Sequence, residues 1–525
     1  MNLIDVLKGV FKKMIKPATI ENVLHIAPTI SSEMKEAIEL WENMYKDQAP
    51  WLNGEIQSLG LPALIASEKA RTATIEMDIK VTGDSARAKY VKDIFKKVIS
   101  SIREELEYGI ALGGFVIKPY VLKDANNKYT MEFTYTRATD FYPLSFSPEG
   151  KVTEAAFVDR IVTKEAVFSK VEYHKLEVNK VHIYNYAFKK EYSGYNTPNA
   201  MDTELGTPIL LTAVPAWSSI EKEVVIDKLD TLLFAYFKMP EANTVDLDSP
   251  LGASGYSRAI DLIKHADELY SDLLWEFEGT QIAIDVDYTA FNYVKGPKGE
   301  NVSVLPKLQE RLYRHNLDLG DEQLYNIFSP AIRDKSILNG LNSQLMRIED
   351  ACFLSRGTLS IVSTSEARTA TELKILKQRS YAANQDIQKA LQETLETVFR
   401  IIDKYCDLYG IVESGEFEVA YKWDDSILID KDAERQQDLL EVNAGLMSKL
   451  EYRMKWYGET EEQAKKSLQQ IDTEAEDKLK MAQKYTETPN NTNGGAKSDA
   501  QKSADKNQRA NESNETTKKT EDTDK

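Results

Sequence analysis

Few residues in this chain have the types and spacing that enzymatic chemistry requires. Asp285 and Asp287 form an Asp-x-Asp pair, whose carboxylate oxygens could hold a divalent cation. A hard cation needs more oxygen ligands than two, and residues two apart on a strand share one face. The simpler interpretation is therefore the solvated face of a strand, with a carboxylate–metal enzyme as the alternative.

Other catalytic motifs are absent from the sequence. It contains no glycine-rich loop that ends in Lys-Ser or Lys-Thr, which a Walker-type nucleotide site needs. A nucleophile elbow needs glycines two positions either side of its serine, and Gly252-Ala253-Ser254-Gly255 falls short of that pattern. The histidines lack the spacing of metal ligands: His25, His174, His182, His265 and His315. We expect a protein without enzymatic activity, cofactor or metal.

Length and charge narrow the class of protein further. With 525 residues, 42% of them hydrophobic, the chain can form a large core and is too long for one ordinary domain. Proteins that grip nucleic acid neutralise phosphates with Lys and Arg, whereas this chain has a net charge of −18. Either no DNA is involved, or DNA passes without being held. Cys352 and Cys406 fall within helical patterns, which predicts buried thiols in a reducing compartment rather than a disulfide.

The two ends of the sequence differ from the rest. Residues 1–16 place apolar residues on one face among lysines, which predicts a basic amphipathic helix. Such a helix could lie on a membrane, but an arm packed on its own or a neighbouring subunit is the simpler interpretation. No apolar run is long enough to span a bilayer, and no secretory signal occurs, so we expect synthesis in the cytoplasm. Residues 486–525 lack large apolar side chains, which predicts disorder.

Periodicity predicts a mixed α+β first half. Apolar spacings of three and four indicate helices over residues 31–46 and 86–110. Alternating apolar residues then predict strands at 115–121, 129–135, 154–162 and 181–188. We expect an N-terminal arm over residues 1–30 and a mixed lobe over residues 31–245.

The second half is informative through the order of its elements. We expect a linker and first long helix over 246–280, a small insert over 281–335, a second helix over 336–356, a loop over 357–368, a long helix over 369–412, a strand over 413–424 and helices over 425–485. A capping box formed by Thr369 and Glu372 opens the long helix, which would extend roughly 60 Å.

Two antiparallel helices joined by a compact insert form a stalk with a knob at its tip. A stalk has little core of its own, so it is stabilised by packing beside copies of itself, and closed rings are the usual solution. We expect the loop at 357–368 at the end opposite the knob, where it can project into the opening of the ring. The predicted interface residues are Leu269 and Leu273 on the first helix, and Leu341 and Leu345 on the second. An ordinary helical hairpin in a monomer is the alternative.

Four stretches of sequence, taken in order, resemble the portal (head–tail connector) family of tailed bacteriophages, in its branch from siphoviruses of Gram-positive hosts. They are Ala111-Leu112-Gly113-Gly114-Phe115-Val116-Ile117-Lys118-Pro119-Tyr120, Asp140-Phe141-Tyr142-Pro143, Leu251-Gly252-Ala253-Ser254-Gly255-Tyr256-Ser257-Arg258-Ala259 and Ser365-Glu366-Ala367-Arg368-Thr369-Ala370-Thr371-Glu372-Leu373-Lys374. The likeness covers residues 30–485.

The resemblance implies a role for each part of the chain. The lobe at 31–245 would be the wing, the helix pair the stem, the insert at 281–335 the clip, the loop at 357–368 the tunnel loop, the helix at 369–412 the spine and residues 425–485 the crown. The assembly would be a dodecamer at one capsid vertex of the virion. Its partners would be double-stranded DNA, the terminase large subunit, a head-completion or adaptor protein, and the major capsid and scaffold proteins, with no membrane.

The negative charge suits a DNA channel, because an acidic lining repels phosphate and lets DNA slide without a deep binding well. Only sparse contacts to the DNA backbone are then expected, and none to base edges. The candidate channel residues lie in and beside the loop: Arg356, Ile361, Val362, Ser363, Thr364, Ser365, Arg368 and Lys374. The alternatives are another ring-forming virion or secretion component that conducts no DNA, the metal enzyme, and a membrane-associated adaptor.

Overall fold

The computed structural model describes residues 18–24, 30–123, 128–148, 150–191, 204–287, 293–299, 301–303, 313–316, 325–361, 370–423 and 431–486. Within these ranges the chain is a mixed α+β protein, as the sequence predicts. It divides into two compact units, Met1–Ile429 and Asp430–Lys525.

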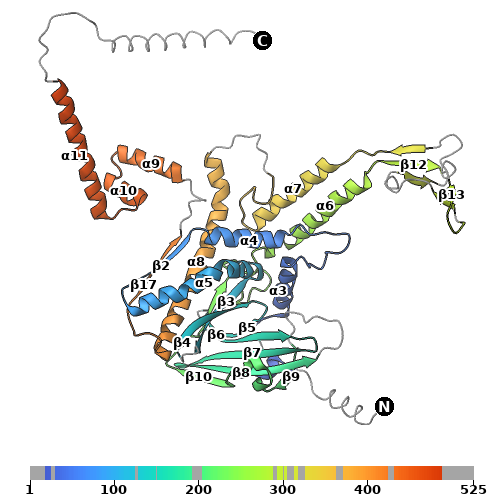
Figure 1. Cartoon of the computed structure of the whole chain (residues 1–525), viewed down its shortest axis with the longest axis horizontal. Coiled ribbons are helices and arrows are strands. Elements are labelled where there is room, and N and C mark those ends of the chain that lie inside the picture. Colours follow the sequence, from blue (N-terminus) through green and yellow to red (C-terminus); the bar gives the residue numbers. More distant parts are fainter. Residues whose placement is uncertain are drawn as a thin grey trace, which may run out of the picture. The chain divides into compact units, whose positions relative to one another are not determined.

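A sheet of seven described strands forms one layer of the first unit (Figure 1). Its order is β1-β9-β8-β7-β6-β5, β10 also pairs with β8, and every pairing is antiparallel. Asn179 takes the positive φ of 57° in the tight turn between β7 and β8, a conformation that asparagine tolerates well. The strands are β1 (Ala18–Thr19), β5 (Phe141–Phe146), β6 (Val152–Val162), β7 (Ala166–Glu177), β8 (Lys180–Glu191), β9 (Glu204–Ile209) and β10 (Glu223–Asp227).

Helix α5 (Ala86–Leu112) packs against a second sheet, of order β11-β3-β4. Ser85 caps its first turn, and Gly113 ends it at a φ of 89°, where glycine is favoured. Its apolar stripe is buried as predicted, at Val91, Phe95, Val98, Ile102 and Leu106. The strands of this sheet are β3 (Gly114–Lys123), β4 (Tyr129–Arg137) and β11 (Ala235–Lys238). The other helices before α6 are α2 (Ile20–Leu24), α3 (Ser32–Tyr45), α4 (Leu61–Thr74) and the short helices η1 (Leu211–Ala213) and η2 (Pro215–Trp217).

Helix α8 (Ala370–Tyr409) packs on α4, α5, β3 and β11. The predicted stripe of this long helix is buried at Ile387, Leu391, Val398 and Ile402. After α8, strand β17 (Glu418–Trp423) pairs with β2 (Met77–Thr82), so the chain returns to the start of the unit.

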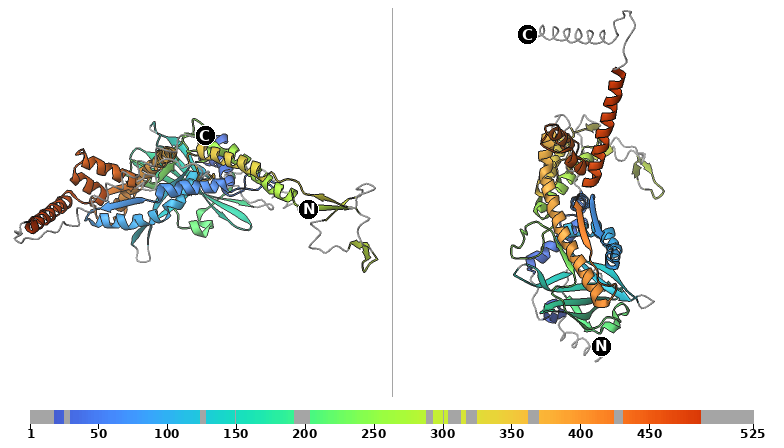
Figure 2. Two further views of the ribbon diagram at one scale, coloured as in Figure 1. Left: turned by 90° about the horizontal axis from the view of Figure 1, so that it is seen from above. Right: turned by 90° about the vertical axis from the view of Figure 1, so that its left-hand side faces the viewer.

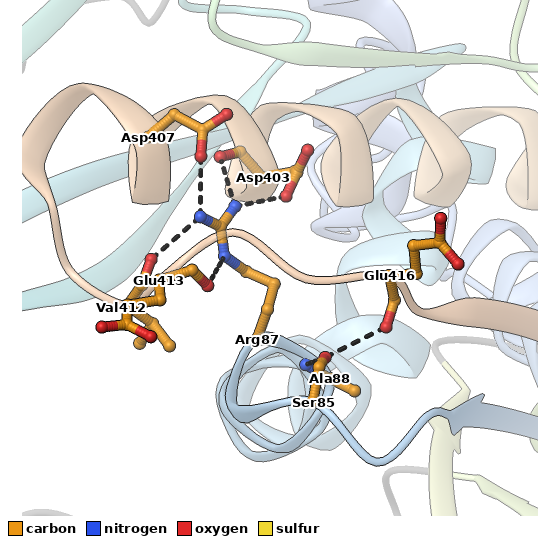
Figure 3. Close-up of polar contacts among 8 residues, drawn as sticks. All are labelled: Ser85, Arg87, Ala88, Asp403, Asp407, Val412, Glu413 and Glu416. Atoms are coloured by element: carbon orange, nitrogen blue, oxygen red, sulfur yellow. Dashed lines mark hydrogen bonds and ion pairs between the residues drawn. The ribbon is translucent and has the colours of Figure 1, made fainter.

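A buried arginine joins α5 to the end of α8 (Figure 3). The side chain of Arg87 is 1% exposed, and its guanidinium donates hydrogen bonds to the carboxylates of Asp403 and Asp407. It also donates to the backbone oxygens of Val412 (2.9 Å) and Glu413 (3.3 Å). Because a buried guanidinium needs partners for its N–H groups, this contact fixes where the chain turns after α8.

Helices α6 (Ile260–Gly279) and α7 (Asp334–Ala351) lie side by side with opposite directions, and strands β12 and β13 lie beyond their far end (Figures 1 and 2). The short helix η3 (Ser257–Ala259) precedes α6. In the insert, β12 pairs with β15 and β16, and β13 pairs with β14. These strands are β12 (Ala283–Asp287), β13 (Tyr293–Lys295), β14 (Asn301–Ser303), β15 (Tyr313–Asn316) and β16 (Tyr325–Phe328).

The second unit, within residues 431–486, contains α9 (Lys431–Asn443), α10 (Lys449–Tyr457) and α11 (Glu461–Thr486). A capping box formed by Ser448 and Glu451 begins α10, and Gly458 ends it at a φ of 63°.

One boundary differs from the sequence prediction. The helix expected over 336–356 ends at Ala351, because the backbone of Phe353 takes a φ of 56° and turns the chain. Cys352 and Cys406 are buried free thiols, as predicted, and burial raises the pKa of Cys352 to about 12. The predicted helix at 1–16, the cap at Thr369 and the tail from 487 lie outside the described residues.

Candidate functional site

The antiparallel pair α6 and α7, here named the stem, is the element most suited to interact with other molecules. Leu273 and Leu341, one on each helix, are buried within the single chain. Leu269 and Leu345 are half-buried and pack against the main core. The four residues predicted at a ring interface therefore already contribute to the packing of one subunit. Their contact with a neighbouring copy stays a prediction.

Several apolar side chains on or next to the stem are exposed. Trp275, on α6, has 70% of its surface exposed, and sequence reasoning missed it. The sequence prediction included Phe277 in the apolar stripe of this helix, but 46% of its surface is exposed. Ile332, just before α7, and Leu338, on its first turns, are also exposed. Trp275 falls outside the stripe that includes Leu269 and Leu273. A large aromatic residue outside the buried stripe of a helix is the sequence signal that could have identified this exposed apolar surface.

A hydrogen-bonded ion pair closes the stem where the insert begins and ends. Glu276, in the last turn of α6, accepts hydrogen bonds from the backbone N–H of Arg333 (2.9 Å) and from its guanidinium (3.2 and 2.7 Å). Arg333 directly precedes α7. The hydrogen bonds from the Arg333 side chain lower the pKa of the Glu276 carboxyl. The two chain ends that carry the insert are thus held together.

The N-terminal half of α6 is anchored to the segment before α4. The buried carboxylate of Asp267 accepts hydrogen bonds from Nε1 of Trp51 (3.0 Å) and from the backbone N–H of Leu59 (2.9 Å). Burial raises the pKa of the Asp267 carboxyl above its ordinary value. This half of α6 is therefore fixed by polar as well as apolar contacts.

The surface of α6 is acidic. The helix has six acidic residues and one lysine. Asp267 and Glu276 are buried and hydrogen-bonded, but Asp261, Asp272 and Glu278 are exposed. Exposed carboxylates on one helix repel the phosphates of nucleic acid, so this helix cannot serve as a tight DNA-binding surface.

A buried carboxylate organises the chain after α7. Glu349 has no exposed surface, and its Oε1 accepts hydrogen bonds from the backbone N–H groups of Gly357 (3.1 Å), Leu359 (2.6 Å) and Ser360 (2.8 Å). Its Oε2 accepts from the hydroxyl of Ser360 at 2.7 Å. Several donors on one carboxylate form a charge-assisted network that fixes the turn.

The chain then runs back along α7. The side chain of Asn342 accepts from the backbone N–H of Ile361 (2.7 Å) and donates to its carbonyl (3.0 Å). Asn342 lies seven residues before Glu349 on α7, on the side of the insert. The sequence prediction placed this loop at the end of the stem opposite the insert, and its residues 362–368 lie outside the described residues. Its described start, residues 357–361, turns back along α7, because Glu349 and Asn342 hold it there.

The predicted channel residues fall into four groups. Ile361 is described and has 77% of its surface exposed. The Arg356 guanidinium donates to the carboxylate of Asp350, which also lies 3.5 Å from Arg379 on α8. The backbone of Lys374 lies in α8, and nothing is described of its side chain. Val362, Ser363, Thr364, Ser365 and Arg368 lie outside the described residues.

Three of the four stretches that carry the family resemblance meet at the root of the stem. A Cβ atom on Gly252 would lie 2.1 Å from the carbonyl oxygen of Gly113, so only glycine fits there. The backbone N–H of Gly252 also donates to the hydroxyl of Tyr236 at 3.3 Å, and the ring of Tyr236 lies 5.0 Å from that of Phe141. The sequence alone did not indicate these contacts, because the residues are far apart in the chain.

A cluster of buried charged residues joins β7 of the seven-stranded sheet to Lys118 on β3. Glu172 accepts from Lys118 (2.8 Å), His174 (2.7 Å) and Lys170 (3.2 Å). Burial opposes the charge on Glu172, but Lys118 and the other neighbours lower its pKa well below the ordinary value. Burial also lowers the pKa of His174. The hydrogen-bonded partners of Glu172 compensate its buried charge, so the cluster is explained by its role in the folded structure.

Among the described side chains, no group of three or more His, Cys, Asp or Glu residues could hold a metal ion. Nor does any described helix have the length and apolar character needed to cross a membrane. Nothing is described of the side chains of Asp285 and Asp287. The chain matches no protein-family model, and no similar sequence is found among curated proteins.

Proposed function

We propose that this chain is the portal subunit of a tailed bacteriophage, which forms a ring at one capsid vertex for the passage of double-stranded DNA. The observation that carries the proposal is the stem, which ends in a strand-rich insert and leaves Trp275 and Phe277 exposed. Exposed apolar surface of this kind is typical of an interface. Copies of one chain usually satisfy such surfaces by closing into a symmetric ring.

The proposed ring assigns a role to each part of the chain. The stems line the channel, and the acidic surface of α6 limits adhesion of DNA. The lobe at 31–245 is the wing, which faces the capsid and scaffold proteins. The insert at 281–335 is the clip, which docks the terminase large subunit and later a head-completion protein. The subunit itself hydrolyses no nucleotide, and the assembly, a dodecamer, is built in the host cytoplasm and retained in the virion.

The segment after α7 is the part proposed to approach the DNA. Glu349 and Asn342 fix the first residues of this segment, up to Ile361. Contacts between this loop and DNA are expected to be weak and independent of sequence, since strong contacts would stall translocation.

The proposal is tested by assembling heads with and without this chain and measuring how much DNA they contain. Labelling of the chain then shows its position on the capsid. We expect the chain at a single vertex, and empty heads when it is omitted. Heads that package a normal amount of DNA without the chain would exclude the proposal. Normal packaging after deletion of residues 357–368 would favour a ring-forming component that conducts no DNA.

A further inference from the structure

The second unit presents charged residues to its own interior. Asp438, on α9, is buried and accepts hydrogen bonds from Nζ of Lys455 (2.7 Å) and Nε1 of Trp456 (2.7 Å), both on α10. Glu434, one turn earlier on α9, also accepts from Lys455 at 2.8 Å. The face of α9 that packs on α10 is therefore its polar face.

Polar contacts also join the remaining helices of this unit. Arg453 makes two hydrogen bonds to the carboxylate of Glu459, at 2.9 and 2.8 Å, just before α11. Arg435 donates to the hydroxyls of Tyr452 (3.2 Å) and Tyr457 (3.4 Å). No disulfide supports the unit, because both cysteines lie in the first unit.

Several large apolar residues of these helices and of the turn between α9 and α10 are exposed. Leu440 has 68% of its surface exposed and Leu446 has 82%. Leu439 and Tyr457 are exposed as well, and we name these four residues the apolar surface of the second unit. Among the described side chains of residues 431–486, Ala464 is the single buried apolar one. A helix of a self-sufficient domain has the reverse arrangement, with its apolar face inward.

This arrangement cannot hold a small unit together unaided. Exposed ion pairs contribute about 0–1 kcal/mol each, and the ordering of the chain opposes folding by about 1–2 kcal/mol per residue. Units of this size without a hydrophobic core, metal or disulfide usually depend on association. The apolar surface therefore needs a partner.

We infer that the second unit is stably folded only when its apolar surface packs against the second units of neighbouring copies of this chain. Residues 431–486 contain twelve acidic and ten basic residues, a net charge of −2, whereas the whole chain has −18. A nearly balanced mixture of charges suits a copy of itself better than a strongly charged partner. A closed ring places identical units side by side, so this inference rests on the ring of the proposed function.

The test is hydrogen exchange of the full chain, measured in dilute monomers and in purified rings. We expect amides of residues 434–457 to exchange at least tenfold more slowly in rings, and close to the unfolded rate in monomers. Leu440→Asp should remove this protection in rings that keep their protected stem amides. Gln437→Asp, which adds the same charge at an exposed polar position of α9, should leave the protection in place.

The possible outcomes support or overturn the inference about the second unit. Protection of residues 434–457 in the monomer, equal to that in rings, would show that the chain itself covers the surface and would overturn the inference. Rings of Leu440→Asp with unchanged protection would overturn it without affecting the proposed portal function. Loss of rings by Leu440→Asp but not by Gln437→Asp would support the same contact. A wild-type chain that never forms rings would overturn both proposals.

Discussion

The carboxylate of Glu349 accepts hydrogen bonds from both the backbone N–H and the hydroxyl of Ser360, at 2.8 and 2.7 Å. The two residues are eleven apart, and Glu349 is fully buried. This single side chain thus determines the course of the chain as it leaves α7. In the proposed portal, it determines where the tunnel loop starts.

Glu349→Ala should loosen this turn while leaving the rest of the stem folded. Loss of the carboxylate leaves the backbone N–H groups of Leu359 and Ser360 without an acceptor, and a buried unsatisfied group costs about 1–3 kcal/mol. The N–H of Gly357 keeps a second acceptor, Oγ of Ser360 at 3.3 Å. We expect faster hydrogen exchange at residues 357–361 and a lower melting temperature. Glu278→Ala, at an exposed glutamate of the stem, is the matched control and should change neither. Unchanged exchange in Glu349→Ala would show that the network does not hold the turn.

Two substitutions on α6 should separate folding from assembly. Leu273 is buried within the subunit, so Leu273→Asp places an unpaired carboxylate in the stem and should lower the yield of folded monomer. Trp275 is exposed, so Trp275→Ser should leave the monomer folded but weaken the ring. Circular dichroism and mass photometry measure the two effects, with Asp272→Ser as the control for the exposed surface. Rings of Trp275→Ser with wild-type stability would argue against a role for this residue at the interface.

The Glu276–Arg333 pair should make the end of the stem sensitive to acid. The pKa of Glu276 is lowered in the folded state, so its contribution to stability is present above the ordinary glutamate value of about 4.5. That contribution is lost as the pH falls below this value through the folded pKa. The protection of amides at residues 276–280, taken relative to the intrinsic exchange rate at each pH, should therefore decrease on acidification in the wild type. Glu276→Gln should show fast exchange already at neutral pH, and a variant with the wild-type pH profile would contradict this assignment.

Ile361→Asp should assemble into rings but reduce the DNA retained in heads. The side chain is 77% exposed in the subunit, so the new carboxylate meets water rather than a core, and it adds a charge that repels phosphate. Val362→Asp is expected to act in the same way. Arg368→Ala should have a smaller effect that depends on salt concentration. The measurement is the DNA content of purified heads. Variant heads with the wild-type DNA content would show that this loop does not contact the DNA.

Sequence periodicity was sufficient for elements with a single long apolar stripe. The predicted helices over 86–110 and 369–412 correspond to α5 and α8, and the described side chains of their stripes are mostly buried. Helix α4 was missed because small alanines, Ala66, Ala70 and Ala73, form much of its buried face and give a weak apolar signal. Strand β7 was also missed, since Lys170 and His174 interrupt its alternation with buried, ion-paired side chains.

The candidate site was less predictable than the fold. The antiparallel stem and its strand-rich insert follow from the order of elements, and both are present. The network around Glu349 could not be predicted, because a buried glutamate looks like any other acidic residue until its donors are placed. The same holds for the contact of Gly113 with Gly252, which joins segments far apart in the chain.

The central claim is that this chain forms a ring with an open channel. Negative-stain electron microscopy of the purified full-length protein tests it most directly. The account predicts closed rings of about twelve subunits with a central hole wide enough for a DNA duplex, and loss of these rings in Trp275→Ser. Particles that remain monomeric at all concentrations, or compact oligomers without a central hole, would contradict it.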